Sequence, residues 1–287
     1  MCKSINRSLQ NKDITIKGLC LKLKMSRQNY YAHHKARQKK SVNKSFIIEL
    51  VKDERKVQSR LGGRKVLHNI KTKLEKNKAS IGRDCFFDIL RENNMLISRK
   101  KSLYPKTTNS RHVLPVFHNE VKNIDIKTPN TAWCSDITYI RTDEGFMYAA
   151  IITDMCSRKI VGAHIGDSLE SFGCVCALEK ALSDLPSGKF PIHHSDRGTQ
   201  YCCHEYVNRL KKRDLTISMT EENHCYENAI AERVNGILKQ EYELDNTFRT
   251  KEHAVYAFYQ AINLYNTRRP HMSLNYQYPS EVHKKAA

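Results

Sequence analysis

The sequence predicts an α/β protein in which a basic, all-helical region precedes a mixed sheet with flanking helices. Before residue 100, apolar residues recur mainly at the three- and four-residue spacing of amphipathic helices. After residue 130, three extended apolar runs come first, and helical and extended patterns then alternate. That order is typical of three antiparallel strands followed by alternating helices and strands in one mixed sheet.

The positive charge lies almost entirely in the helical region. The chain of 287 residues has a formal net charge of +19. Residues 1–110 hold 28 Lys and Arg against 8 Asp and Glu, whereas the rest of the chain holds 21 against 22. A polyanion is the simplest partner for such a region, although charge alone does not distinguish DNA from RNA. The alternative is an ordinary basic surface.

Residues 1–40 are expected to form a helix-turn-helix-like segment. Ser26 is a plausible N-cap for a helix that begins at Arg27. Arg27, Gln28 and Asn29 then occupy its first turn, where side chains that read a DNA groove would lie. A small helical hairpin that only packs is the alternative.

A second helical DNA-binding unit is expected over residues 41–103. Its helices are predicted at 43–60, 64–75 and 83–93, with a break at Gly62-Gly63. Arg64 and Lys65 are further candidate DNA contacts at the start of the middle helix. The basic cluster around residues 99–106 is either an arm along a phosphate backbone or a solvated linker. Three prolines and weak periodicity favour a linker at 104–129.

The remaining elements divide into a core at 130–245 and a C-terminal helix and tail at 246–287. Asp154 is expected to close a hairpin between two strands, and Arg268 and Arg269 to cap the C-terminal helix, with DNA contact as a secondary possibility. Strands are predicted near 132–141, 146–154 and 159–165, then one that ends at Ser195 and a short one at 216–219. Helices are predicted near 171–184, 204–213 and 250–265, and around Glu232.

Three carboxylates stand out by their settings. Asp136 lies inside an extended run, Asp196 follows the apolar run 190–192, and Glu232 lies near the start of a helix with an apolar stripe. A carboxylate inside a strand is costly unless its charge is satisfied. If the three converge, a divalent cation is the natural counter-charge, and carboxylate oxygens suit Mg²⁺ or Mn²⁺. For any one of them alone, an ordinary structural charge is the alternative.

The words around these residues carry a family resemblance. The sequence resembles the DDE transposases of bacterial insertion sequences in three motifs, WxxDITYI, HSDRGxQY and ENAIAE. It shares with them the spacing of 35 residues between Asp196 and Glu232. The motifs are more similar to the OrfB product of elements with two overlapping frames than to retroviral integrases. The resemblance implies an RNase H-like core with a mixed five-stranded sheet. Lys239 matches the family's basic residue two helical turns after the Glu, so it is expected to point into the same site.

The resemblance also implies chemistry and partners. Asp136, Asp196 and Glu232 would hold two Mg²⁺ or Mn²⁺ ions, Lys239 would contact DNA, and strand cleavage would be followed by attack of the freed 3′-hydroxyl. The first expected partner is double-stranded DNA, at both the element ends and the target, with the protein forming a homo-oligomer on that DNA. The second is an upstream reading-frame product, or a frameshift fusion with it. A nuclease that cuts without joining and a non-catalytic DNA-binding regulator remain as alternatives.

Other features concern location and supporting residues. No run of 18 apolar residues and no signal region occur, so a cytoplasmic, nucleoid-associated bacterial protein without a membrane span is expected. The ten cysteines form no CxxC pair, which favours reduced thiols. His194 either orients a phosphate or metal-bound water or is a hydrogen-bonded core residue. Asn228 and Asn235 lie near the face of Glu232, and helix capping is the alternative for Asn228.

Overall fold

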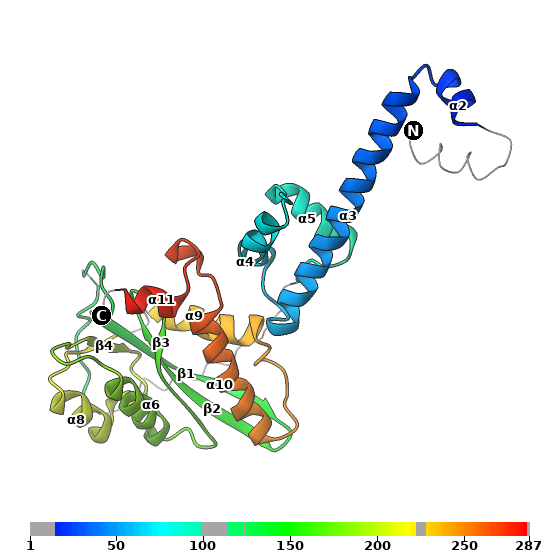
Figure 1. Ribbon diagram of the computed structural model, residues 1–287. Coiled ribbons are helices and arrows are strands. Elements are labelled where there is room, and N and C mark those ends of the chain that lie inside the picture. Colours follow the sequence, from blue (N-terminus) through cyan, green and yellow to red (C-terminus); the bar gives the residue numbers. More distant parts are fainter. Residues whose placement is uncertain (1–14, 99–113, 123, 222–227, 286–287) are drawn as a thin grey trace. The chain divides into compact units, whose positions relative to one another are not determined.

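The computed structural model describes residues 15–98, 114–122, 124–221 and 228–285 (Figure 1). The chain divides into two units, Met1–Glu54 with Ile70–Met95, and Arg55–Asn69 with Leu96–Ala287. The basic cluster near residues 99–106 and most of the loop 220–227 lie outside the described residues. Within the described ranges, no helix is long and apolar enough to cross a membrane.

The described elements follow the predicted order closely. The helical part contains α2 (Ile16–Lys22), α3 (Arg27–Val57), α4 (Gly63–Lys76) and α5 (Arg83–Glu92). The α/β part contains β1 (Ala132–Thr142), β2 (Gly145–Asp154), β3 (Ile160–Gly166), α6 (Ser171–Ser183), β4 (Ile192–Ser195), α7 (Thr199–Cys202), α8 (His204–Lys212), β5 (Ile217–Met219), α9 (Ala229–Glu241), α10 (Lys251–Thr267), a short 3₁₀ turn (Met272–Leu274) and α11 (Pro279–Lys284).

In the first unit, α3 is longer than the sequence predicts. The Ser26 hydroxyl accepts from the backbone N–H of Asn29 at 3.1 Å, which confirms the predicted N-cap. The separate helices expected before and after residue 40 are one helix of 31 residues. Lys, Arg, Gln and Ala fill much of the intervening stretch, and no Gly or Pro interrupts it, so nothing there favours a break. The buried apolar side chains of the unit include Ile47, Val51, Leu74, Phe86 and Leu90.

The second unit is built on a five-stranded mixed sheet with strand order β3-β2-β1-β4-β5. β1, β2 and β3 are antiparallel neighbours, and β4 and β5 extend the sheet in parallel with β1. β1 therefore lies at the centre, with the long hairpin on one side and the two short strands on the other. This confirms the RNase H-like class that the resemblance implies.

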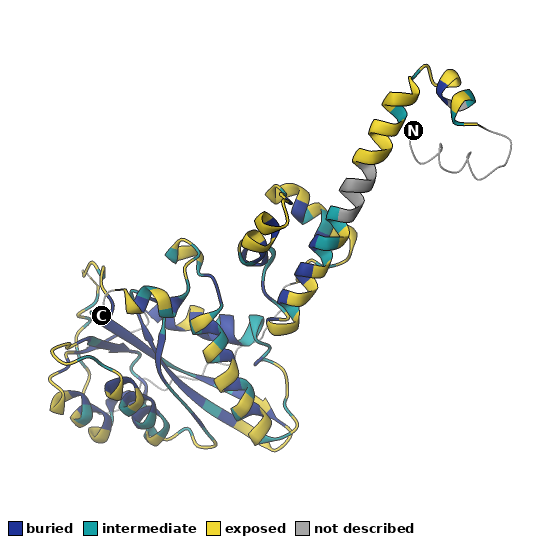
Figure 2. Cartoon of the chain, viewed as in Figure 1, coloured by how far each residue is buried: buried dark blue, intermediate teal, exposed yellow. Residues whose placement is uncertain are grey.

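Alternating residues of the strands form two separate cores. Trp133 and Ile152 face one core, to which α6 and α8 contribute, while Ile140 and Ile151 face the other, to which α9 and α10 contribute. Successive side chains of a strand point to opposite faces, so a sheet covered on both sides needs apolar residues at nearly every position. Figure 2 shows the resulting burial along the strands and on the inner faces of the helices.

Part of the predicted linker packs against the sheet. Leu114 and Phe117 lie on the core beneath α6 and α8. The carbonyl of His118 accepts from Met219 N at 3.3 Å, and Glu120 N donates to Ser218 Oγ at 2.8 Å. The described residues from 114 therefore run along β5.

We expect Gly162→Ala to destabilise the protein by about 3 kcal/mol, because the site has no room for a methyl group. A Cβ on Gly162 of β3 would lie 2.2 Å from the carbonyl oxygen of Ala177 and 2.9 Å from the Ala181 methyl, both on α6. The helix would have to move away from the sheet. Thermal or denaturant unfolding measures the loss.

Gly236→Ala is the matched control for this substitution. Gly236 lies inside α9 and a Cβ there would meet nothing within 4 Å. Alanine at such a helical position should raise the free energy of unfolding by about 0.5–1 kcal/mol. Equal effects of the two substitutions would contradict the close contact between α6 and β3.

Candidate functional site

Two of the three predicted carboxylates come together at the centre of the sheet. Asp136 lies in the middle of β1, and Asp196 directly follows β4. These strands are parallel, and Cys134 pairs with His194. Asp136 and Asp196 each lie two residues beyond this pair, and both line one cavity.

A polar cavity of about 30 Å³ lies at these two side chains. Its volume suits a single water-sized guest or a bare ion. The residues that line it are Asp136, Ile137, Tyr139, Leu169, Asp196, Gly198, Gln200 and Tyr201. The sequence motifs around Asp136 and Asp196 thus lie together at this cavity, although they are about 60 residues apart in the chain.

The surroundings of Asp136 oppose its ionisation. Burial, followed by the negative charge of Asp196 and, more weakly, that of Glu232, raises the pKa of its carboxyl group, which lies at about 7. Two hydrogen bonds act in the opposite direction: Ile137 N donates to Oδ1 at 2.9 Å and Asn235 Nδ2 to Oδ2 at 2.7 Å. A cation in the cavity would relieve the repulsion between these carboxylates.

Two asparagines fasten α9 to β1 on either side of Glu232. Asn228 Nδ2 donates to the carbonyl of Ser135 at 2.9 Å, and Asn235 donates to Asp136. Asn228 occupies the N-cap position of α9, but its side chain makes no capping hydrogen bond, so the capping explanation was wrong. Both amides are buried. They bind the strand itself, and the predicted substrate contact is not needed to explain them.

Glu232 and Lys239 lie on the helix face that these asparagines define. Glu232 is four residues after Asn228, and Lys239 four after Asn235, so all four share one side of α9. Glu232 is exposed in the first turn. Burial lowers the pKa of Lys239, while the negative charges of Asp245 and then Asp136 raise it. Both predicted side chains are therefore within electrostatic reach of Asp136.

The three carboxylates do not form a closed metal cage. Among the described residues, no three His, Cys, Asp or Glu side chains are grouped closely enough to hold a metal ion. Asp136 and Asp196 share the cavity, whereas Glu232 is exposed on the helix beside it. Two carboxylates therefore line the cavity, and the third lies on the neighbouring helix.

The loop after Asp196 holds the second carboxylate in place. Gly198 N donates to Asp196 Oδ1 at 3.0 Å, and a Cβ on Gly198 would lie 3.0 Å from that same oxygen. Arg197 Nε donates to the carbonyl of Thr220 at 2.7 Å, and Gln200 Nε2 to that of Leu169 at 2.9 Å. Arg197 and Gln200 thus brace the loop from behind.

Two buried histidines of β4 support the site from below. His193 Nε2 hydrogen-bonds with Ser135 Oγ at 2.8 Å and Tyr206 OH at 2.9 Å. Burial, and then the neighbouring His194, lower the pKa of His193 to about 3, so it is neutral at physiological pH. His194 Nδ1 lies 2.8 Å from Ser218 Oγ, which agrees with its reading as a hydrogen-bonded core residue.

Asp154 is structural, as its turn position predicts. Its fully buried carboxylate accepts from Asn130 N at 2.7 Å, Ser157 N at 2.7 Å and Ser157 Oγ at 2.6 Å. Burial would raise its pKa, but the nearby imidazole of His283, 3.9 Å away, and the hydrogen bonds from Ser157 and Asn130 hold the pKa below its ordinary value. This carboxylate closes the β2–β3 hairpin and belongs to no catalytic cavity.

The predicted DNA contacts fall into two groups. Arg27, Gln28 and Asn29 are exposed at the start of α3, and Arg64 is exposed on α4. Lys65 is different: its ammonium is buried and lies 2.6 Å from Glu241 Oε1, so it is not available to a phosphate. The prediction for Lys65 was wrong because its side chain points into the fold.

The C-terminal arginine pair is used only in part as predicted. Arg268 occupies the C-cap position of α10, and its backbone N–H donates to the carbonyl of Leu264. Arg269 is almost fully buried and donates from Nε and Nη2 to the two oxygens of Glu241, at 2.8 and 2.9 Å. It therefore does not cap α10. Sequence reasoning missed Glu241, which follows Glu232 by nine residues, because a glutamate at a helix end carries no signal of its own.

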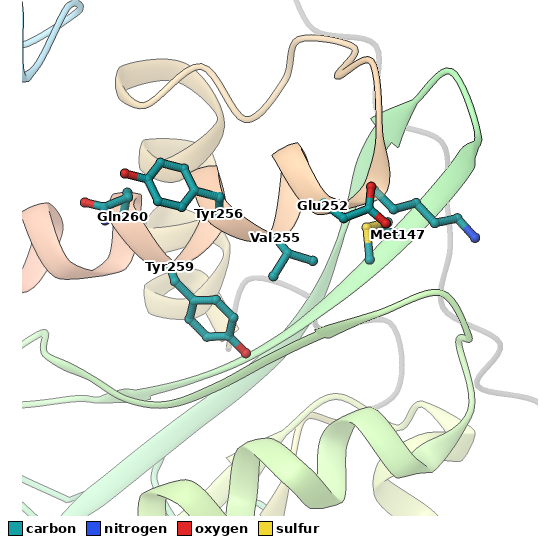
Figure 3. A pocket seen from close by; sticks show the side chains of 7 residues that line it. Met147, Glu252, Val255, Tyr256, Tyr259 and Gln260 are labelled. Carbon is teal, nitrogen blue, oxygen red and sulfur yellow. The ribbon is translucent and has the colours of Figure 1, made fainter.

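A larger pocket of about 510 Å³ lies elsewhere, between α10 and β2. Val255, Tyr256 and Tyr259 project from α10 and Met147 comes from β2 (Figure 3). Its lining is mainly aromatic and aliphatic, with Lys251 and Glu252 at one end. Among the described residues of its lining, Glu252 is the one acidic residue, so this pocket offers no pair of carboxylates to a cation.

Comparisons with known proteins agree with the fold. Two family models described as integrase core domain match residues 127–225 and 213–279. The 31 kDa protein of insertion element IS600 from Shigella sonnei is 30% identical over 271 residues, which are 93% of this chain and 98% of that protein. The transposase for insertion sequence element IS629 from the same organism is 33% identical over 180 residues, 62% of this chain and 60% of its own.

Among solved structures, the HTLV-2 integrase catalytic core domain in complex with magnesium is 20% identical, with a TM-score of 0.43 over 54% of this chain and 97% of its own. The matched family models span the sheet, both cavity carboxylates and the helix of Glu232. The IS600 relative extends over nearly the whole chain. This chain therefore belongs to the integrase-core family of insertion-sequence transposases.

Proposed function

We propose that this transposase binds the ends of its insertion sequence and catalyses divalent-metal-dependent strand cleavage, followed by attack of the freed 3′-hydroxyl on target DNA. The observation that carries the proposal is the pairing of Asp136 and Asp196 at one small cavity, with Glu232 and Lys239 on the adjacent face of α9. The family membership supports a transposition function, and this geometry supports its chemistry.

The donor set fits a hard divalent cation. Two carboxylates line a cavity of ion size, and the negative charge of Asp196 helps to raise the pKa of Asp136. Asp136, Asp196 and Glu232 would hold Mg²⁺ or Mn²⁺, and all three would supply the oxygen ligands that these ions prefer. When bound, two such ions supply a clamp for the attacking and leaving oxygens of an in-line displacement at phosphorus.

The protein's own groups would position the DNA. Lys239 is half-buried beside Asp136, where its charge suits a phosphate at the cut. Asn235 keeps Asp136 in one orientation, and the Gly198 N–H does the same for Asp196. The exposed Arg27, Gln28, Asn29 and Arg64 remain our candidates for binding the element ends.

The partners follow from this activity. We propose double-stranded DNA as the substrate, at both element ends and target, and a homo-oligomer assembled on it, because two ends must be joined. An upstream reading-frame product or frameshift fusion stays a prediction, as does the cytoplasmic, nucleoid-associated location. The excess positive charge of residues 1–110 supports the DNA partner.

An assay with labelled element ends and a target duplex tests the proposal. With Mg²⁺ in excess, we expect nicked ends first and joined products later. Chelation with EDTA should abolish both products, and added Mn²⁺ should restore them. Asp196→Asn should bind the ends but form neither product.

The outcomes separate the proposal from its rivals. Cleavage without any joined product would support a nuclease of the same fold and overturn the transferase. End binding with equal function in EDTA and in Asp196→Asn would support a non-catalytic DNA-binding regulator. Either result contradicts the proposed chemistry but leaves the family assignment intact.

A further inference from the structure

The carboxyl end of α9 holds a carboxylate where helix electrostatics disfavour one. Glu241 is the last residue of α9, and its side chain is only 17% exposed. The C-terminal end of a helix carries partial negative charge, so an acidic side chain there is repelled, and burial adds a desolvation penalty. Glu241 therefore does not stabilise its own helix, and the reason for its presence lies in what it binds.

Two cations surround this carboxylate. Lys65 Nζ lies 2.6 Å from Oε1, and Arg269 contacts both oxygens through Nε and Nη2. Burial alone would raise the pKa of Glu241, but the hydrogen bonds and charge of Arg269, followed by the charge of Lys65, lower it to about 2. The carboxylate is ionised at any physiological pH and is fully occupied by protein donors.

Further contacts hold the same helix end to the segment 55–69. Arg60 Nε donates to the carbonyl of Gln240 at 3.0 Å, which satisfies one of the backbone acceptors left free at a helix terminus. Ser59 Oγ donates to Glu243 Oε2 at 2.8 Å, just beyond the helix. Three side chains of one short segment, Ser59, Arg60 and Lys65, thus bind residues 240–243 around the end of α9.

This segment is continuous with the helices of the first unit. It contains the last residues of α3 and the first of α4, and both helices run from it into that unit. The other end of α9 carries Glu232, and its middle carries Asn235 and Lys239. A shift of the helix along its axis would move all three relative to Asp136.

We propose that Glu241 and Lys65 are positioning residues, which together with Arg269 and Arg60 lock α9 in the register that presents Glu232 to the Asp136–Asp196 cavity. The lock also anchors the joint of α3 and α4 to the catalytic helix. In this account Lys65 serves catalysis through α9 and not through a phosphate. The proposal rests on the proposed function only where it assigns a catalytic consequence to the register.

Three substitutions in the full-length protein test whether these contacts hold the register of α9: Lys65→Met, Lys65→Arg and Arg60→Met. Lys73→Met is the matched control. Lys73 also lies on α4 and pairs with a glutamate, Glu54, at 3.4 Å, but it belongs to the first unit. Amide hydrogen exchange of α9 is measured first, because it needs neither DNA nor metal. Binding of labelled element ends at several salt concentrations and single-turnover cleavage at saturating DNA follow.

We expect Lys65→Met and Arg60→Met each to speed exchange in the last turns of α9 by about tenfold, with little change in Lys73→Met or Lys65→Arg. Cleavage at saturating DNA should fall about 10- to 100-fold in Lys65→Met, because small displacements of reacting groups are costly. End affinity and its salt dependence should not change. Arg60→Met keeps the test sound if Lys65→Met fails to fold, because Arg60 contributes one hydrogen bond and no buried ion pair to α9.

Two results would overturn the lock. Unchanged exchange in α9 for both variants would show that the contacts do not hold its register. Weaker end binding with a salt slope lower by about one would instead make Lys65 a phosphate contact. Failure of the proposed function would look different. Exchange in α9 would still be faster in the variants, but the protein would keep full activity after loss of the Glu232 charge. The contacts would then hold α9 in its register without any consequence for catalysis.

Discussion

Replacing Asp136 with Asn is expected to lower strand cleavage by about 10³-fold or more, and at the same time to stabilise the cation-free protein at pH 8. The loss of activity follows from removal of a carboxylate that we propose as a metal ligand, at the cavity shared with Asp196. The gain in stability follows from removal of a buried charge that lies beside another carboxylate. Asn has nearly the same shape and still accepts from Asn235, so packing is retained.

The stability gain has a definite pH dependence. The folded protein raises the pKa of Asp136 from 3.8 to about 7, so between these values the folded state holds a proton that the unfolded state has lost. The free energy of unfolding therefore falls as pH rises from about 4 to about 7 and is lowest above that range. The Asn variant lacks this dependence. Its advantage should be absent near pH 4 and reach about 2–4 kcal/mol at pH 8.

Thermal unfolding across this pH range, with and without Mg²⁺, measures the effect. In the native chain, Mg²⁺ should raise the melting temperature at pH 8 and progressively less below pH 7, because the cation must displace a proton. In Asp136→Asn the Mg²⁺ shift should be largely lost. Asp184→Asn, which changes an exposed carboxylate at the end of α6, is the control for loss of one charge. If Asp136→Asn is less stable than the native chain at pH 8, the ionised Asp136 carboxylate does not destabilise the folded protein and this explanation is contradicted.

The layout of the α/β unit was accessible from the sequence because its signals are local. The run Ala132–Thr142, buried or half-buried at nearly every position, could be read as a central strand, and Asp136 was conspicuous within it. The partner of that strand was not readable in this way. It came from the family resemblance, because a parallel pairing between residues near 134 and 194 depends on contacts far apart in the chain.

The errors share a physical cause. Lys65 looks like any other lysine of a basic helix, and only the position of Glu241, 176 residues later, explains why its side chain turns inward. The predicted break near residue 40 came from treating two apolar patterns as two helices. A stretch rich in good helix formers joins them, and a helical segment without an apolar stripe leaves no periodic signal.

Asn235 shows the intermediate case. Its spacing from Glu232 placed it correctly on one face of α9, since the helical repeat is a local property. The identity of its partner is not local: its amide binds Asp136 itself, 99 residues earlier in the chain. Spacing along a helix therefore located the site's residues, whereas the roles of those residues required the sheet.

Glu232→Gln should abolish cleavage about as completely as the loss of Asp136, with almost no change in stability. Glu232 is exposed, so Gln keeps its shape and removes only its charge. The charge lies in the first turn of α9, where it interacts favourably with the helix dipole, and its loss should cost less than about 1 kcal/mol. Removal of one metal ligand should lower the cleavage rate about 10²- to 10⁴-fold.

The two variants differ in a way that identifies the site. Glu232 contributes to the raised pKa of Asp136, so in Glu232→Gln the pH-dependent part of the unfolding free energy should shift to lower pH without disappearing. Glu205→Gln, an exposed first-turn glutamate of α8, is the matched control and should leave both cleavage and this shift unchanged. Cleavage within about threefold of the native rate in Glu232→Gln would remove Glu232 from the metal site. The cavity would then be a two-carboxylate centre, because Asp136 and Asp196 adjoin each other through the strands and not through α9.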